Sequence, residues 1–242
     1  MHAWRWPRSQ GSFYLAAYNL GLLAGWAYVL GLTIKVAFVE GGSPADVYAA
    51  VALPLMVSQT AAVMEIVHSA IGVVRSPLFV TATQVFSRLW ILWGIVVPVS
   101  GPVLSGSVGF PGIPPLACFS FTSLMVAWAT TEVIRYSFFG LKELGSVPYI
   151  SLWLRYSAFI PLYPIGVASE LTMVWLAMPT IGATRMWSVD MPNAFNDAFD
   201  YYIACVVVVA LYLPGLPYLY AYMLTQRGKM LSPTKATKPK AQ

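Results

Sequence analysis

Tyr163 and Glu170 are two chemically active side chains near the middle of one long apolar stretch, residues 149–179. Seven residues make nearly two turns of an α-helix, so both side chains face the same way, roughly 10 Å apart along the axis. A carboxylate accepts protons and a tyrosine hydroxyl donates them. Because an ionisable group within a membrane is costly, the pair indicates a functional site. The alternative is that Glu170 joins helices as a polar contact.

The stretch that carries this pair is long enough to cross a hydrocarbon core of about 30 Å. Pro164 and Gly166 lie between the two side chains. Proline has no backbone N–H, so Pro164 frees the carbonyl of Ile160. We expect a kink at that point, where the polar groups face inward.

The composition places this stretch in a helical membrane protein. The 242 residues are 58% hydrophobic and 10% charged, and the apolar runs are too long for the core of a soluble domain. We therefore predict an all-α fold, a single membrane domain over residues 1–242 in which six helices form a bundle. The predicted spans are residues 13–39, 48–74, 78–99, 114–139, 149–179 and 199–224, followed by a basic tail at 225–242.

Basic residues alternate between the predicted loops, which sets the orientation. Those predicted to lie on one side are Arg5, Arg8, Arg75, Arg135, Lys142, Arg155 and the lysines and arginine of the tail. The loops between these carry mainly acids, although Lys35 and Arg185 run against the trend. Since basic residues mark the cytosolic side, both termini are predicted to be cytosolic.

A second set of polar residues lies within the spans or at their ends and predicts a polar interior. Its members are Glu65, His68, Arg88, Glu132, Arg135 and Arg155. Such groups must face the bundle and find partners there. We expect Arg88 to neutralise Glu65 or Glu132. A supporting network is favoured over direct chemistry, although Arg135 and Arg155 are also placed to meet an anionic substrate head group.

The sequence argues against several other classes of protein. Cys118 and Cys205 lie in apolar segments and form no disulfide framework. With His2 and His68 as the histidines, no metal site is expected. The basic residues lie between and beyond the spans, so the net charge of +5 does not indicate nucleic-acid binding.

One short pattern has the spacing of a tyrosine-phosphatase signature: His68, Ser69 and, after five further residues, Arg75. That chemistry needs a thiolate in a phosphate-binding loop. Serine stands at the nucleophile position here, and the segment is typical of the end of a membrane helix. Phosphatase activity is therefore not expected.

Four stretches together resemble the very-long-chain 3-hydroxyacyl-CoA dehydratases, also called protein-tyrosine-phosphatase-like membrane proteins, and most closely the plant and algal, PASTICCINO-type branch. They are QTAAVMEIVHSAIGVVRSP (59–77), TATQVFSRLW (81–90), WATTEVIRYSFF (128–139) and LRYSAFIPLYPIGVASE (154–170). In that family the tyrosine and glutamate of the YPxGxxxE segment are the catalytic pair. The resemblance places them at Tyr163 and Glu170.

The resemblance implies the third step of microsomal fatty-acid elongation, in which a (3R)-3-hydroxyacyl-CoA loses water to give the trans-2-enoyl-CoA. Elimination needs a base for the C2 proton and an acid for the departing hydroxyl, without a metal or organic cofactor. Glu170 as base and Tyr163 as proton donor is the favoured assignment, and the reverse is the alternative. The implied partners are the acyl-CoA substrate, the lipid bilayer and other elongation enzymes. A catalytically inactive scaffold of the elongation complex is the alternative function, and a transporter is less well supported.

The end of the chain bears on location. Lys238 and Lys240 lie five and three residues from the C-terminus, which resembles a dilysine retrieval signal of the endoplasmic reticulum. A plain basic tail near anionic lipid is the alternative. We therefore expect a multi-pass protein of the endoplasmic-reticulum membrane.

Overall fold

Helices make up nearly all of the chain in the computed structural model, which describes residues 12–74, 76–109, 118–194 and 196–232. The described helices are α1 (Ser12–Ile34), the π-helical η1 (Lys35–Val39), α2 (Pro44–Ala61), α3 (Val63–Ala70), α4 (Leu78–Leu89), the π-helical η2 (Trp90–Val96), α5 (Ser100–Ser105), α6 (Phe121–Glu143), α7 (Tyr149–Ser157), α8 (Phe159–Thr184) and α9 (Tyr201–Leu231). Within these ranges two isolated β-bridges occur and no strand. The predicted all-α class is confirmed.

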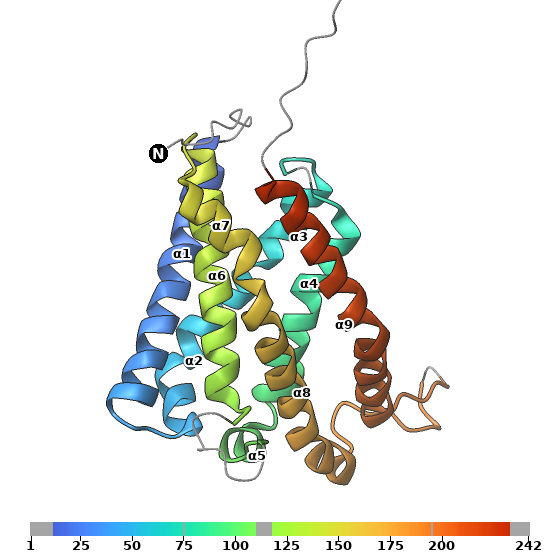
Figure 1. The fold of residues 1–242 in the computed structure, drawn as a ribbon. Coiled ribbons are helices and arrows are strands. Elements are labelled where there is room, and N and C mark those ends of the chain that lie inside the picture. The colour runs from blue at the N-terminus through green and yellow to red at the C-terminus, as the bar shows by residue number, and fades with distance from the viewer. Residues whose placement is uncertain (1–11, 75, 110–117, 195, 233–242) are drawn as a thin grey trace, which may run out of the picture.

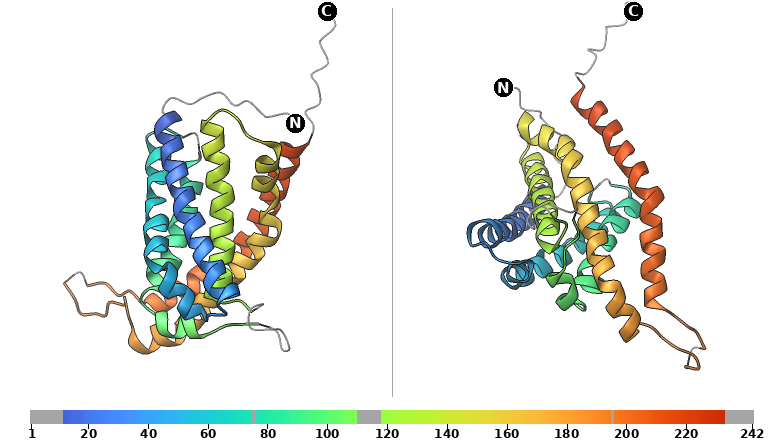
Figure 2. Two further views of the ribbon diagram at one scale, coloured as in Figure 1. Left: turned by 90° about the vertical axis from the view of Figure 1, so that its left-hand side faces the viewer. Right: turned by 60° about the horizontal axis from the view of Figure 1, so that its bottom comes forward.

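The long helices stand side by side in a bundle (Figure 1). The start of α1 and the end of α9 lie at the same end, at the top of that view. α6 runs through the middle and packs against both α1 and α8, whereas α9 lies at the side of the bundle next to α8 (Figures 1 and 2). Side chains on different faces of α6 therefore contact different neighbouring helices in the interior of the bundle.

Five segments of the described chain are long and apolar enough to cross a membrane. They are Phe13–Val39, Pro44–Ala70, Leu78–Val96, Phe159–Thr184 and Tyr201–Leu231. α6 is 23 residues long but is not among them, since Glu132 and Arg135 interrupt its apolar character. Because α6 runs through the middle of the bundle, its polar groups Glu132 and Arg135 face neighbouring helices.

The helix bounds differ from the predicted spans where local signals were overlooked. The second helix begins at Pro44, because Ser43 caps it in a reciprocal box with Asp46 and proline fits the first helical position. The last helix continues past residue 224 to Leu231, so the first part of the predicted tail is helical. Residues 110–117, where the fourth span was expected to begin, lie outside the described part, and α6 begins at Phe121.

The predicted span 149–179 is interrupted at Ala158, where α7 ends and α8 begins. Pro161 explains the position of this break: it has no N–H to offer the carbonyl of Ser157. The side-chain hydroxyl of Ser157 accepts a hydrogen bond of 3.1 Å from Arg227 Nε, so α9 is joined to the chain at this break. Pro164, where a kink was expected, lies inside continuous α8.

A continuous apolar core joins α1, α2, η2, α6 and α8, with Trp26, Leu55, Ile95, Phe121 and Met173 among its fully buried side chains. Small residues allow close approach between some of these helices. A Cβ added to Gly25 on α1 would lie 2.5 Å from Ser58 Oγ on α2, so a larger residue there would force the Ser58 side chain to move. A second apolar cluster joins α6 and α7 to the end of α9.

Candidate active site

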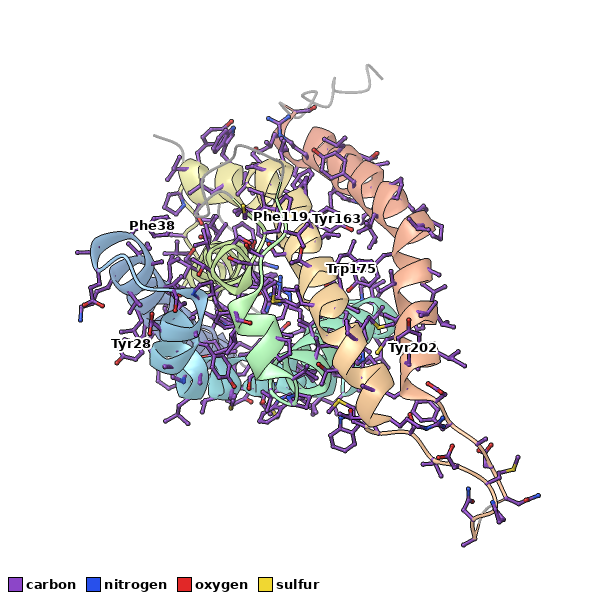
Figure 3. All side chains as sticks on the ribbon, turned by 90° about the horizontal axis from the view of Figure 1, so that it is seen from below. Tyr28, Phe38, Phe119, Tyr163, Trp175 and Tyr202 are labelled. Atoms are coloured by element: carbon purple, nitrogen blue, oxygen red, sulfur yellow. The ribbon has the colours of Figure 1, made fainter. Side chains whose placement is uncertain are left out.

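Tyr163 and Glu170 both lie on α8, as predicted, at partly buried positions of the same helix face. Figure 3 shows Tyr163 on the side of α8 that faces α9. Its ring lies 6.1 Å from the ring of Tyr220 on α9, centroid to centroid, and Tyr220 in turn packs edge-on against Phe159. Tyr163 is thus held at the boundary between α8 and α9.

The carboxylate of Glu170 is bonded from two other helices. Trp128 on α6 donates its indole N–H to Oε1 at 2.8 Å. Tyr212 on α9 donates its hydroxyl to Oε2 at 3.0 Å. Three helices therefore meet at this one carboxylate, and its orientation is fixed by two side chains that belong to neither α8 nor the YPxGxxxE segment.

An ion-pair network lies beside this carboxylate, between α3, α4 and α6. Glu132, whose side chain is 3% exposed, accepts hydrogen bonds from Arg88 on Oε1 and from Arg135 on Oε2, the latter at 2.5 and 2.8 Å. The predicted pairing of Arg88 with Glu65 or Glu132 is confirmed, and the partner is Glu132.

Arg135 extends the network to α3. Its Nη1 donates to Glu65 Oε2 at 2.6 Å, and the hydroxyl of Tyr136 donates to Glu65 Oε1 at 2.5 Å. Two carboxylates and two guanidinium groups therefore alternate, so that each charge faces its opposite. Such complete pairing is what allows buried charges to persist.

Arg88 connects the network to the candidate catalytic carboxylate. Its guanidinium carbon lies 5.3 Å from the centre of the Trp128 ring, a cation–π contact, while the N–H of the same ring bonds Glu170. The structure thus brings four of the predicted supporting residues into one assembly: Glu65, Arg88, Glu132 and Arg135.

His68 and Arg155, also predicted to support the site, occupy different surroundings. His68 is buried between the rings of Tyr14 and Tyr18 on α1 and shares a hydrogen bond of 2.9 Å with the Tyr14 hydroxyl. Arg155 on α7 lies 5.8 Å from the ring centre of Phe139. His68 therefore helps to join α1 and α3, and Arg155 lies toward the end of the bundle where α9 finishes.

Sequence analysis missed Trp128 and Tyr212. Trp128 had a usable signal, because it lies four residues before Glu132 and so on the same face of α6. Tyr212 had none: it is one of 14 tyrosines, and the neighbouring residues 203–217 of its helix are otherwise apolar, glycine or proline.

The phosphatase-like pattern forms no phosphate-binding loop among the described residues. Ser69 belongs to α3, and its hydroxyl donates to the carbonyl of Ser76 at 2.8 Å. Arg75 lies outside the described residues. The hydroxyl that stands in the nucleophile position is thus engaged in closing the turn after α3.

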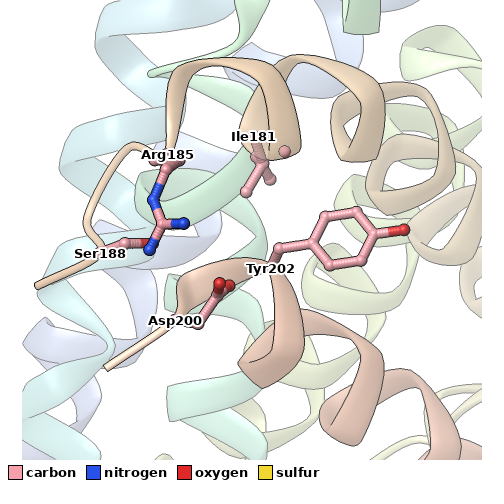
Figure 4. Close-up of a pocket in the computed structure, with 6 residues that line it drawn as sticks. Ile181, Arg185, Ser188, Asp200 and Tyr202 are labelled. Atoms are coloured by element: carbon pink, nitrogen blue, oxygen red, sulfur yellow. The ribbon is translucent and has the colours of Figure 1, made fainter. Parts of the chain in front are cut away.

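An open pocket of about 230 Å³ lies elsewhere, at the far end of α8 (Figure 4). It is lined by Ile181, Gly182, Arg185, Ser188, Asp200 and Tyr202. Arg185 is fifteen residues beyond Glu170, or roughly 22 Å along the helix. This pocket is therefore separate from the candidate active site.

Comparison with known proteins identifies close relatives of the whole chain. A family model described as "Protein tyrosine phosphatase-like protein, PTPLA" matches residues 59–233. "Very-long-chain (3R)-3-hydroxyacyl-CoA dehydratase PASTICCINO 2" of Arabidopsis thaliana is 46% identical over 223 residues, 92% of this chain and 94% of that protein. PASTICCINO 2A of Oryza sativa, which has the same dehydratase name, is 42% identical over 92% of this chain and 95% of its own. "Very-long-chain (3R)-3-hydroxyacyl-CoA dehydratase 2" of Homo sapiens is 36% identical over 93% of this chain and 83% of its own. No solved structure matched.

Proposed function

Because this chain belongs to the protein tyrosine phosphatase-like, PTPLA, family, we propose that it dehydrates very-long-chain (3R)-3-hydroxyacyl-CoA to the trans-2-enoyl-CoA. The enzyme is a hydro-lyase of very-long-chain fatty-acid elongation and a helical membrane protein. Its catalytic pair, in this proposal, is Tyr163 and Glu170. The observation that carries the site assignment is the Glu170 carboxylate, held by hydrogen-bond donors on both oxygens within a span that also presents Tyr163.

The reaction divides between these two side chains as a general acid–base elimination. One group takes the C2 proton, while the other protonates the C3 hydroxyl as the C–O bond breaks and water leaves. The electron pair of the C2–H bond becomes the new double bond. Return of a proton from the first group to the second restores the enzyme, so the cycle needs no net proton and no redox partner.

The substrate has an apolar acyl chain and a charged coenzyme, and these two parts require different surroundings in the protein. The two side chains that bond Glu170, Trp128 and Tyr212, are aromatic, and their rings offer apolar surface to the hydrocarbon chain. Arg155 on α7 and Arg227 on α9 lie toward the end of the bundle where α9 finishes. We propose that the CoA phosphates lie at this end, near these guanidinium groups.

We further propose six membrane spans, with α6 as the additional one, and both termini in the cytosol. α6 packs between α1 and α8, which are apolar enough to span by themselves. An even number of passes accounts for the start of α1 and the end of α9 at the same end of the bundle.

The proposed location is the endoplasmic-reticulum membrane, where other enzymes of fatty-acid elongation are the proposed partners. Lys238 and Lys240, which carry the predicted retrieval signal, lie outside the described residues. A catalytically inactive scaffold of the elongation complex is the alternative function. It would not require Tyr163 and Glu170 to have their side-chain chemistry, and this separates the two hypotheses.

The decisive experiment assays purified full-length protein, in detergent or nanodiscs, with 3-hydroxyacyl-CoAs of several chain lengths. Tyr163→Phe and Glu170→Gln nearly preserve side-chain volume, so both variants should fold. Each should lower turnover by about 10²-fold or more, the scale for losing a positioned acid or base. The double variant should be little worse than the poorer single variant, because both groups serve one elimination.

Two controls accompany the pair. Tyr218→Phe removes the hydroxyl of a residue on α9 that is 73% exposed, and it should leave turnover unchanged. Glu65→Gln should affect folding or substrate binding more than the chemical step. Near-normal dehydration by well-folded Tyr163→Phe and Glu170→Gln would show that the pair is structural and that the site assignment is wrong.

A further inference from the structure

The two side chains that hold Glu170 differ in what they can do chemically. The indole N–H of Trp128 is a donor only, so Oε1 must act as an acceptor toward α6. The hydroxyl of Tyr212 donates to Oε2 but is also able to accept. Oε2 can therefore carry a proton and keep Tyr212 as its partner, whereas a proton on Oε1 would face another donor.

The two oxygens also face different parts of the bundle. Oε1 is bonded from α6, which runs through the interior, and Oε2 is bonded from α9. Tyr163 faces α9 as well, as its ring contact with Tyr220 shows. An acid and a base that act on one substrate must reach the same side, and Oε2 is the oxygen on the Tyr163 side.

We propose that Trp128 and Tyr212 are positioning residues that hold Glu170 as the carboxylate base, and that Oε2 is the oxygen that takes the C2 proton. This rests on the proposed function, and it decides between the two assignments of the pair: Glu170 is the base and Tyr163 the proton donor. Tyr212 donates a hydrogen bond to Oε2 before the transfer, and its hydroxyl oxygen accepts a hydrogen bond from the protonated Oε2 after it.

Arg88 strengthens one of these contacts. Its charge over the Trp128 ring draws electron density from the indole and makes the N–H a better donor to Oε1. Arg88 is itself held by its ion pair with Glu132. The ion-pair network therefore helps to fix the position of the Trp128 ring, through the contact of Arg88 with that ring.

The other contact depends on α9, which is the most loosely held of the candidate spans. In its apolar window 6% of residues are buried, against 28–33% in the other four. Tyr212 therefore reaches Glu170 from a helix that packs little against the rest of the bundle. Its hydroxyl holds Oε2 by a hydrogen bond, which apolar packing alone would not supply.

The test compares Trp128→Phe and Tyr212→Phe with controls that lose a hydrogen bond of the same kind away from Glu170. Trp128→Phe keeps an aromatic face for Arg88. Trp93→Phe is its control, since the Trp93 indole donates to the Thr60 hydroxyl at 3.2 Å. Tyr201→Phe is the control for Tyr212→Phe, because Tyr201, also on α9, donates to a backbone carbonyl at 3.0 Å.

The full-length variants are assayed with substrate that carries hydrogen or deuterium at C2, with rates normalised to folded protein. Both test variants should lower kcat by about 10- to 100-fold, the scale for a hydrogen bond to a charged group. Their KM should stay within about threefold of wild type, because the lost bonds act on the chemical step. The deuterium isotope effect should be at least as large as in wild type, since proton abstraction is the step that slows. Both controls should keep wild-type kcat per folded molecule.

Two results would overturn the proposal. The first is a kcat per folded molecule that stays near wild type in either test variant, which would make that contact ordinary packing. The second is an isotope effect that falls toward one, which would mean that a step other than C2 proton abstraction has slowed. Glu170→Gln, run beside them, separates this from failure of the proposed function: if that variant is fully active, Glu170 is not catalytic at all.

Discussion

Arg135→Met should destabilise the protein more than Arg88→Met, although both replace an arginine of the same network. The reason is the number of carboxylates that each guanidinium serves. Arg135 bonds both Glu132 and Glu65. Arg88 bonds Glu132. Removal of Arg135 therefore takes an ion pair from each of two carboxylates, and of these two Glu132 still has Arg88.

The magnitudes follow from what remains after each change. Without Arg88, Glu132 keeps its two hydrogen bonds from Arg135, so the loss is one charge-assisted bond, or about 1.5–3 kcal/mol. Without Arg135, Glu65 loses its ion pair and Glu132 loses one of two. The side chains are 17% and 3% exposed, so water does not replace the lost partner, and the cost is about 3–5 kcal/mol.

The assay is the free energy of unfolding, from titration with a denaturing detergent in mixed micelles followed by circular dichroism. Arg185→Met is the matched control. Its ion pair with Asp190 has side chains that are 55% and 70% exposed, so the change should cost about 1 kcal/mol or less. Adding Glu65→Gln to Arg135→Met should recover part of the loss, because it removes the carboxylate that Arg135→Met leaves without its ion pair.

Two outcomes would contradict this reasoning. If Arg88→Met lowers the free energy of unfolding as much as Arg135→Met does, the number of carboxylates that each arginine bonds does not govern the stability of the network. If Arg88→Met folds normally but raises KM, Arg88 binds anionic groups of the substrate instead of serving as a structural partner.

Two further predictions concern topology and location. In sealed microsomes of a variant without native cysteines, Ser107→Cys should be shielded from a membrane-impermeant reagent and Ser146→Cys should react, since their loops lie at opposite ends of an odd number of spans; labelling of Ser107→Cys would contradict six spans. Replacement of Lys238 and Lys240 by Ser should let part of the protein reach the Golgi, because a retrieval receptor reads the dilysine pair, and an unchanged distribution by microscopy would leave the tail without that role.

The class of fold was predictable from the sequence because it depends on local properties. Long apolar runs without enough polar surface for a soluble domain require a membrane, and a membrane requires that backbone groups be satisfied within helices. The shared face of Tyr163 and Glu170 follows from helical periodicity alone. The break before α8 and the start of α2 were local features too. Pro161 marks the first and Ser43 the second, by rules that involve only neighbouring residues.

The environment of Glu170 was decided by the tertiary structure. Its two donors, Trp128 and Tyr212, each lie 42 residues away along the chain, one before it and one after. The sequence showed that charged residues within the spans must find partners, because lipid leaves no other choice. Which arginine meets which glutamate depends on how α4 and α6 are placed, and no periodicity within one helix contains that information.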